Sequence, residues 1–407
     1  MAIKDTLTPM KTRKIRLTAL AAALFLGVAA GPSPVFGLGI AVPDQDAFAT
    51  ARGNAFVATA NDPAAIFYNP AGISQLDGAN VSLGAYGLVY GDRYTGPAGS
   101  LDSKTQWAAL PQFFSTFSLS NYHLTFGLGA YCPYGLRNDW PNNAPFLAAG
   151  QTGQISYMTT AAMVAWQIAP TLSLAAGPTF NYSAVELKEF PGFANQFNGR
   201  ATAAGYTAGL LFHPAQQHYF GITYRSATEM NYNGHATVPI FPFTATTAAS
   251  ADFHFPATLA VGYSYRPTPK WNFEGDVNWT DWSTLKNVPL VPLPPADSLT
   301  FDWSPSWMLD LGVTRYLGND WRLSGGYMFS GNSVPDAHFN PLVPDSDRHL
   351  FSLGVGKKCG RFSWDAAYQL AWGPSRSISG DATAFGAPNG KYQFLSHALT
   401  INLGYHF

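Results

Sequence analysis

The sequence predicts an all-β fold, a transmembrane antiparallel β-barrel of about fourteen strands with an N-terminal hatch, or plug, inside its lumen. Aromatic residues make up 15% of the 407 residues and charged residues only 12%, with 39 glycines and 30 prolines. This composition favours many short strands and turns over helices. Segments that alternate large apolar with small or polar residues recur from about residue 79 to the end. A mean hydropathy near zero agrees with a barrel, because only alternate residues of its strands meet lipid.

The N-terminus carries an export signal, which we assign to residues 1–36. Basic residues at 11–16 precede an apolar stretch at 17–30 that is too short to span a bilayer. Cleavage is expected between residues 30 and 37. The two cysteines, Cys132 and Cys359, fall at opposite ends of the expected barrel, so both are predicted to be free.

The next segment, residues 37–76, lacks the two-residue period of a strand and is rich in Ala, Asp and Asn. It is too long for a tail that only reaches the barrel wall. A barrel of about fourteen strands encloses a lumen wider than side chains alone can fill. We therefore place residues 37–76 inside the lumen as a plug and assign residues 77–407 to the barrel.

Fourteen alternating segments follow, joined in turn by tight turns and long connections. They lie near 79–90, 107–119, 122–132, 153–168, 171–189, 202–213, 218–230, 252–266, 270–284, 302–317, 320–330, 349–357, 361–372 and 393–407. Short turns at one rim and long loops at the other are typical of outer-membrane barrels and not required of a soluble β-sandwich. The long connections are expected near 91–106, 133–152, 190–201, 231–251, 285–301, 331–348 and 373–392.

Individual strands show the expected division into two faces. One predicted row contains Phe253, Phe255, Ala257, Leu259, Val261, Tyr263 and Tyr265. The last strand, 395–407, has large residues at every second position and ends on Phe407. It is expected to close the barrel by pairing with the first strand at the periplasmic rim.

Two local motifs interrupt these patterns. Asn69-Pro70-Ala71 lies at the junction of plug and barrel, where the plainest interpretation is a tight turn. Pro133-Tyr134-Gly135 lies at the outer end of the third strand. Because Pro cannot donate to a neighbouring strand and Gly weakens pairing, this motif either starts a loop or opens a gap in the wall.

Together these motifs resemble the FadL/TodX family of outer-membrane transporters for hydrophobic compounds. Gly37-Leu38-Gly39-Ile40 and Asn69-Pro70-Ala71 resemble the two ends of that family's hatch, and Pro133-Tyr134-Gly135-Leu136 resembles its strand-three kink. Trp279-Thr280-Asp281-Trp282-Ser283 and Pro344-Asp345-Ser346-Asp347-Arg348 resemble later family signatures. The resemblance implies passive passage of apolar molecules and lateral exit at the kink. It also implies a hatch whose gating residues are Leu38, Gly39, Ile40, Asn69, Pro70 and Ala71.

The resemblance also suggests which residues could capture or bind the substrate. Apolar residues in two long connections, among them Phe241, Phe243, Val291 and Leu293, form a candidate capture surface, although loop packing would explain them equally well. Fatty-acid members of the family place basic residues in the lumen. Here Glu189 and Ser304 fall at such positions, and Lys188 and Arg200 are the nearest cationic substitutes. The substrate is therefore either a long-chain fatty acid or a neutral or aromatic hydrocarbon.

Other functions find little support in the sequence. No His-x-His, His-Glu-x-x-His or Gly-x-Ser-x-Gly motif occurs, so we expect no catalytic residues, metal or cofactor. A net charge of −1 argues against nucleic acid as a partner. A diffusion porin for polar solutes is the main alternative, and an outer-membrane lipid-modifying enzyme a weaker one. We expect a monomer in the outer membrane of a Gram-negative bacterium, in contact with lipid and with the barrel-assembly machinery through the Phe407 strand.

Overall fold

The computed structural model describes residues 39–147, 150–188, 196–240, 243–291, 298–379 and 388–407, which belong to one compact unit, Val35–Phe407. The predicted signal peptide and Leu38 lie outside the described residues. No helix in the described part of the chain is long and apolar enough to cross a membrane. Cys132 and Cys359 are both free, as predicted.

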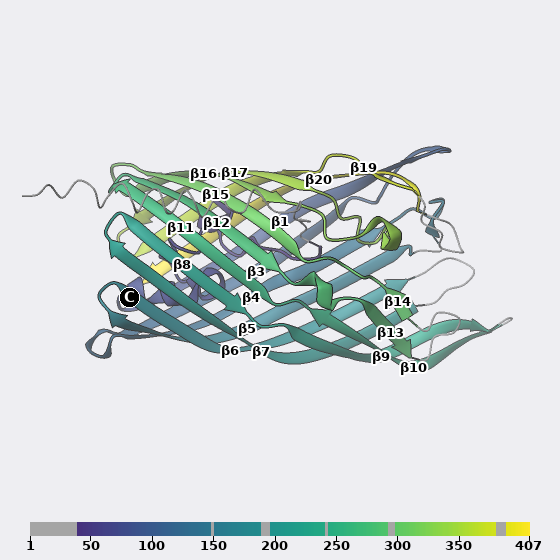
Figure 1. Cartoon of the computed structure of the whole chain (residues 1–407), viewed down its shortest axis with the longest axis horizontal. Helices are drawn as coiled ribbons and strands as arrows, with labels where there is room; N and C mark the ends of the chain where they lie inside the picture. The colour runs from purple at the N-terminus through teal and green to yellow at the C-terminus, as the bar shows by residue number, and fades with distance from the viewer. Residues whose placement is uncertain (1–38, 148–149, 189–195, 241–242, 292–297, 380–387) are drawn as a thin grey trace, which may run out of the picture. The chain divides into compact units, whose positions relative to one another are not determined.

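The predicted fourteen-stranded antiparallel barrel is confirmed (Figure 1). Its strands are β1 (Ala79–Gly96), β3 (Gln106–Leu119), β4 (Leu124–Asp139), β5 (Thr152–Ala169), β6 (Leu172–Lys188), β7 (Gln196–Ala215), β8 (His218–Arg225) continued by β9 (Thr228–Ile240), β10 (Phe243–Phe255) continued by β11 (Thr258–Thr268), β12 (Trp271–Thr280), β15 (Ser306–Tyr316), β16 (Trp321–Ser330), β17 (Arg348–Cys359), β18 (Phe362–Trp372) and β20 (Gly390–His406). Closure is achieved by β20, which pairs with β1 from Asn80↔His406 to Thr95↔Lys391.

Smaller elements lie at the two rims of the barrel and inside its lumen. The short strands are β2 (Gly99–Asp102), β13 (Asn287–Val291), β14 (Ser298–Thr300) and β19 (Arg376–Ile378). The helices are α2 (Ala47–Ala51), α3 (Ala65–Tyr68), η2 (Pro70–Gln75), η3 (Ser120–Tyr122), η5 (Trp282–Thr284) and η6 (Asp336–His338).

Several strands run further toward the long-loop rim than predicted. The expected loop at 231–251 is a hairpin of β9 and β10, and β1 continues to Gly96 before turning into β2. Backbone groups beyond the bilayer still gain by pairing. Their side chains no longer need to alternate, however, so the sequence pattern fades before the strands end.

The two faces of the wall separate as expected along most strands. In β20, Leu399, Ile401 and Leu403 are 53%, 47% and 61% exposed, whereas Thr400 and Asn402 are at most 4% exposed and face inward. So many large apolar side chains on the surface would be a liability in water and suit a lipid environment.

One predicted row was wrong. Phe253 and Phe255 are buried and point into the lumen, whereas Leu259 and Val261 are exposed on the outside. Regular pairing breaks at Pro256, which has no N–H to donate, and the inward parity changes there. The neighbouring strand breaks in the same way at 226–227, between β8 and β9.

Residues 39–76, which we call the plug, pack against the inner faces of strands on several sides of the barrel. Helix α2 contacts β16, β17, β18 and β20, and η2 contacts β4, β5, β6 and β7. Glycines in the wall allow this close approach. A Cβ on Gly221 would lie 2.1 Å from the carbonyl oxygen of Val57, and one on Gly326 would lie 2.0 Å from the carbonyl carbon of Arg52.

Two acids of β12 hold the middle of the plug. Asp276 Oδ2 accepts hydrogen bonds from the backbone N–H groups of Phe56 and Val57 at 2.7 and 2.9 Å. Glu274 accepts from the next two N–H groups and pairs with Arg52 at 3.0 Å, with both charged side chains fully buried. Removing one partner of such a buried pair costs about 3–5 kcal/mol, so this part of the plug is firmly anchored.

Candidate functional site

The barrel wall has a gap between its second and third strands. β3 pairs with β4 only from Phe113↔Ala130 to Leu119↔Leu124. Among the described residues, the outer half of β4, from Tyr131 to Asp139, has no ladder partner on β3, although it stays paired with β5. Backbone groups left without a partner at membrane depth are costly, so something else must satisfy them.

The gap begins at the predicted kink. Between Tyr131 and Tyr134 the pairing of β4 with β5 shifts, because three steps along β4 correspond to two along β5. Such a one-residue bulge bends its strand and re-aims the side chains that follow. Pro133 and Tyr134 both lie here and are buried. The third strand is therefore interrupted where the Pro-Tyr-Gly motif stands.

The first residues of the plug occupy this gap. Ala41 forms an antiparallel bridge with Tyr134. The N–H of Val42 donates to the carbonyl of Pro133 at 2.8 Å, and the N–H of Gly135 donates to the carbonyl of Ile40 at 3.0 Å. We call residues 40–42 the plug strand, since it takes the place that β3 leaves empty.

A glutamine side chain also hydrogen-bonds to β4 in the gap. Gln45 accepts from the N–H of Cys132 at 3.1 Å and donates to the carbonyl of Cys132 at 2.9 Å, as a neighbouring strand would. On the β3 side of the gap, Gln112 donates to the carbonyl of Asp44 at 2.9 Å. The segment 40–45 thus closes the wall from inside.

An aromatic pocket holds the start of the plug strand. Ile40 is 2% exposed within an apolar cluster that includes Tyr134, Trp282 and Trp303. Trp282 and Trp303 pack edge to face with their ring centroids 4.9 Å apart. Gly39 has a φ of +54°, and a Cβ there would lie 2.8 Å from the Trp303 ring, so this position requires glycine.

The loop after β16 also contacts the plug. The N–H of Gly39 points to Asp345 Oδ2 at 3.4 Å, and the same oxygen accepts from the backbone and hydroxyl of Ser333 at 2.9 and 3.0 Å. Arg348 lies 3.6 Å from the other carboxylate oxygen. The plug strand is therefore linked to the long-loop rim as well as to the wall gap.

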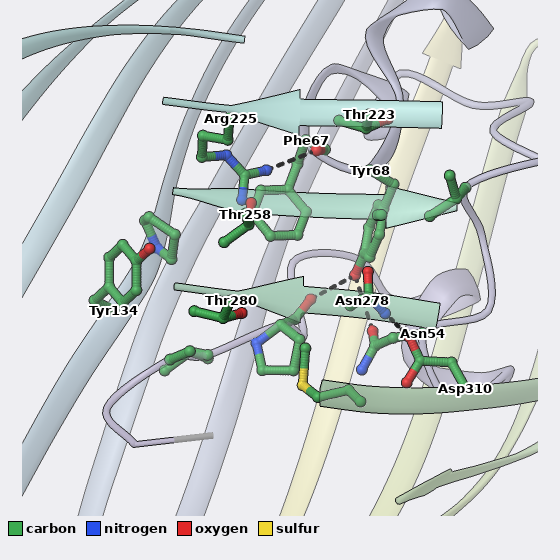
Figure 2. A pocket seen from close by; sticks show the side chains of 17 residues that line it. Asn54, Phe67, Tyr68, Tyr134, Thr223, Arg225, Thr258, Asn278, Thr280 and Asp310 are labelled. Atoms are coloured by element: carbon green, nitrogen blue, oxygen red, sulfur yellow. Dashed lines mark hydrogen bonds between the residues drawn. The ribbon is translucent and has the colours of Figure 1, made fainter. Parts of the chain in front are cut away.

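A cavity of about 80 Å³ lies behind the plug strand. Its described lining comes from the plug strand, from Pro133 and Tyr134, from Phe67 and Tyr68 of the plug body, and from the inner faces of β8, β11, β12 and β15. Figure 2 shows Arg225 reaching from the wall to the carbonyl of Phe67, with a nitrogen–oxygen distance of 2.9 Å. The cavity thus connects a cationic side chain with the residues at the gap.

Asn69-Pro70-Ala71 lies away from the gap and serves as a cap and anchor. The side-chain oxygen of Asn69 accepts from the N–H of Ala71 at 3.1 Å at the start of η2. Its amide donates to the carbonyls of Val57 and Leu210 at 2.8 and 3.0 Å, which ties plug to wall. The tight turn predicted at Asn69-Pro70-Ala71 therefore corresponds to the capped start of η2.

The structure does not support the predicted carboxylate partners. Lys188 and Arg200 are exposed on the outward-facing positions of β6 and β7, and Lys188 pairs with Glu186. Neither side chain can meet a group inside the lumen. Their direction depends on strand parity, which the resemblance to the family does not determine.

The candidate capture surface is only partly described. Phe243 is 76% exposed next to the tip of the β9–β10 hairpin. Val291 pairs with Ser250 of β10 through its backbone, which places it in a strand rather than in a free loop. Phe241 and Leu293 lie outside the described residues.

Sequence reasoning missed Arg225, Trp303, Glu274 and Asp276. A signal existed for the two acids, because they follow Asn272 at two-residue steps on one face of a strand and so had to face a plugged lumen. Among the described residues, no group of three His, Cys, Asp or Glu side chains could hold a metal ion.

Comparisons with known proteins agree with this architecture. The profile of the family described as "Outer membrane protein transport protein (OMPP1/FadL/TodX)" matches residues 29–407. Among relatives, the long-chain fatty acid transport protein of Salmonella typhi is 22% identical, over 86% of this chain and 88% of that protein. A putative outer membrane protein of Neisseria meningitidis, NMB0088, is also 22% identical, over 94% and 97%.

Solved structures show the same fold. A Pseudomonas aeruginosa FadL homologue superposes with a TM-score of 0.82 at 18% identity, covering 91% of this chain and all of that one. The Pseudomonas putida toluene transporter TodX gives a TM-score of 0.72 at 15% identity, covering 92% and 100%. The profile spans nearly the whole chain and matches the barrel on which the gap and the plug strand are built, so this protein belongs to the OMPP1/FadL/TodX family of outer-membrane transport proteins.

Proposed function

We propose that this protein passes hydrophobic small molecules through the outer membrane without an energy source and releases them sideways, through the gap between β3 and β4, into the bilayer. One observation carries the proposal. The outer half of β4 is completed by the plug strand rather than by β3, so departure of the plug strand alone would open the wall. The family relatives are named for fatty acids and the similar structures for toluene, which agrees with apolar cargo.

The energetics suit a ligand-operated gate. Two backbone hydrogen bonds, the Gln45 pair and the burial of Ile40 hold the plug strand, and each such contribution is about 1–3 kcal/mol. A ligand that fills the Ile40 pocket would replace the apolar contacts that the strand loses. Differential binding of a few kcal/mol is enough to shift such an equilibrium.

The moving part is confined to the start of the plug. Residues 52–59 are held by the buried acids of β12, whereas residues 40–42 are held by two backbone hydrogen bonds to β4 and one large apolar side chain. We therefore assign gating to Gly39, Ile40 and the plug strand and a fixed, supporting role to Asn69-Pro70-Ala71. A porin for polar solutes needs an open, hydrated lumen, which is at odds with a plug whose residues Ala47–Ala51 are all buried.

A reversible cross-link tests the gate. Ala41 and Tyr134 are directly opposed, and the hydrogen bonds lie on either side of them, which is the geometry in which Cα atoms approach to about 4.5 Å. In a background without the native cysteines, A41C/Y134C should form a disulfide. Oxidised protein in lipid vesicles should lose transfer of an apolar substrate, and reduction should restore it.

The control locks the plug body instead. The hydroxyls of Ser74 and Ser173 lie 2.8 Å apart between η2 and β6, so S74C/S173C joins two parts that are not expected to separate. Oxidation of this control should leave transfer intact. Equal transfer by oxidised and reduced A41C/Y134C would show that the gap is not the exit.

A further inference from the structure

The cations of the short-turn rim lie on one side of the barrel. The first three short turns and the strand ends beside them, within 117–126, 166–174 and 212–220, contain no Lys or Arg. The last three contain one acid, Asp320, and a set of cations from strands that follow one another in the wall from β11 to β18 (Figure 1). These cations are Arg266, Lys270, Arg315, Arg322, Lys357, Lys358 and Arg361.

Two of these cations point out of the barrel, where its apolar outer face ends. Thr314 is 0% exposed and faces the lumen, so the next residue of β15, Arg315, faces outward. Gly356 is buried on the lumen side of β17, so Lys357 faces outward in the same way. The outward row of β17 continues into Leu353, which is 70% exposed. Both cations therefore stand at the edge of the surface that meets lipid.

Each of the two cations lies over a tryptophan on the neighbouring strand. Arg315 is opposite Trp271, and its guanidinium carbon lies 4.5 Å from the ring centroid. Lys357 is opposite Trp321, and its Nζ lies 4.8 Å from that ring centroid. Tryptophan is favoured at the boundary between membrane and water, because its ring is apolar and its N–H is polar. The two cations are thus at the level of lipid head groups.

Neither cation is neutralised by the protein. In the part of the chain that the structure describes, Arg315 and Lys357 take part in no ion pair and donate no side-chain hydrogen bond, although both are half-buried. Only β16 separates their strands, which places β15 and β17 about 10 Å apart. Two long side chains at this spacing can reach one head group, and a phosphate is an acceptor that both bind well.

We propose that Arg315 and Lys357 form a binding site for the head group of an anionic phospholipid, whose acyl chains lie along the apolar outer face of β15, β16 and β17. The short-turn rim of outer-membrane barrels faces the periplasm, so this lipid belongs to the inner leaflet. A soluble partner would have to displace lipid from the same surface, which favours a lipid as the occupant.

The test compares two phospholipids that have the same chains. Purified protein freed of lipid is titrated in detergent with equal amounts of dioleoyl phosphatidylglycerol, which is anionic, and dioleoyl phosphatidylcholine, which is zwitterionic. Native mass spectrometry measures the ratio of the two bound lipids. Wild-type protein should prefer the anionic lipid. In Arg315→Gln/Lys357→Gln this ratio should fall roughly 10- to 30-fold, since each cation near an anionic lipid surface strengthens binding about fivefold.

Lys358→Gln/Arg361→Gln is the matched control. It removes the same charge from the same rim, but both side chains are exposed and neither lies over a tryptophan. Its lipid ratio should stay close to that of the wild type. An equal fall in both double variants would overturn the proposal, because it would mean that the rim attracts anions only as a whole.

Three other outcomes would also overturn the proposal. They are a wild-type protein without preference, an unchanged ratio in Arg315→Gln/Lys357→Gln, and displacement of the lipid by an equal concentration of inorganic phosphate, which would indicate a simple anion site. If the double variant does not fold, the two single variants, each with an expected fall of about fivefold, carry the same test. The site lies away from β3 and β4, so its failure would leave the lateral route and the A41C/Y134C experiment unaffected.

Discussion

Truncation of Ile40 to alanine should detach the plug strand without unfolding the rest of the plug. Ile40 is 2% exposed and packs among Tyr134, Trp282 and Trp303. It is the main apolar anchor of a strand that otherwise depends on two backbone hydrogen bonds to β4 and the side chain of Gln45. Its loss should therefore act on the gap directly.

The size of the effect follows from the packing. Replacing a buried Ile by Ala costs about 2–5 kcal/mol, and the lower half of that range applies where neighbours can relax into the space. Each 1.4 kcal/mol changes an equilibrium constant about tenfold. For about 2–3.5 kcal/mol, the population of detached plug strand should rise roughly 30-fold to about 300-fold.

Amide hydrogen exchange measures this population at the bonds that break. The N–H groups of Val42 and Gly135 bridge the gap at 2.8 and 3.0 Å, and their exchange should accelerate by the same factor. The N–H groups of Phe56 and Val57, held by Asp276, should exchange at the wild-type rate.

Two outcomes would contradict this reasoning. Unchanged exchange at Gly135 would mean that Ile40 does not hold the strand, and equal acceleration at Phe56 would mean that the plug opens as one body. Ile73→Ala makes the same chemical change at a fully buried site in η2. It should loosen the plug body and leave Gly135 protected as long as the strand stays in place.

Three further predictions concern the seat of the plug. In Gly221→Val, the new side chain would collide with the carbonyl oxygen of Val57, which lies 2.1 Å from the Cβ position. The plug should then fail to pack against the wall and become sensitive to protease. A plug that stays as protected from protease as in the wild type would contradict the close approach. Asp276→Ala leaves the N–H groups of Phe56 and Val57 without an acceptor, at about 1–3 kcal/mol each, and should raise ion conductance in planar bilayers, whereas an unchanged conductance would show that other contacts suffice. Burial raises the pKa of Asp46 from 3.8 to about 6, so the packed plug binds a proton at Asp46 more tightly than the unfolded chain does. Protection of the plug from protease should therefore fall as the pH rises from about 4 to 6. An Asp46→Asn variant that kept the full wild-type pH dependence would exclude Asp46 as its source.

Local patterns were sufficient to predict the barrel. A lipid-facing strand needs an apolar residue at every second position. Each strand therefore carries this alternation in its own sequence, as residues 395–407 do, and can be recognised without the others. The turns alternate because they sit on opposite sides of the membrane. The strand count and the closure of β20 on β1 followed from these local signals, and so did the interruption at Pro133, since a missing N–H acts wherever the strand lies.

The same reasoning failed where parity changes within a strand. Pro256 switches the face of its strand, so Phe253 and Phe255 point inward although the row seemed continuous. The sequence predicts Lys188 and Arg200 as lumenal cations, but they lie on outward positions. A shift of one residue moves every later side chain to the other face, so alternation alone does not determine which face of a strand points inward.

By itself, the sequence determined the compartment, the strands and the place of the kink, because each depends on residues close together in the chain. Only the tertiary structure decided that the plug strand fills the gap beside β4 and that Arg225 lines the cavity behind it. Those contacts join residues about 90 or more positions apart in the chain across a closed barrel. They depend on the stagger of all fourteen strands and on the path of the plug through the lumen, which no single segment contains.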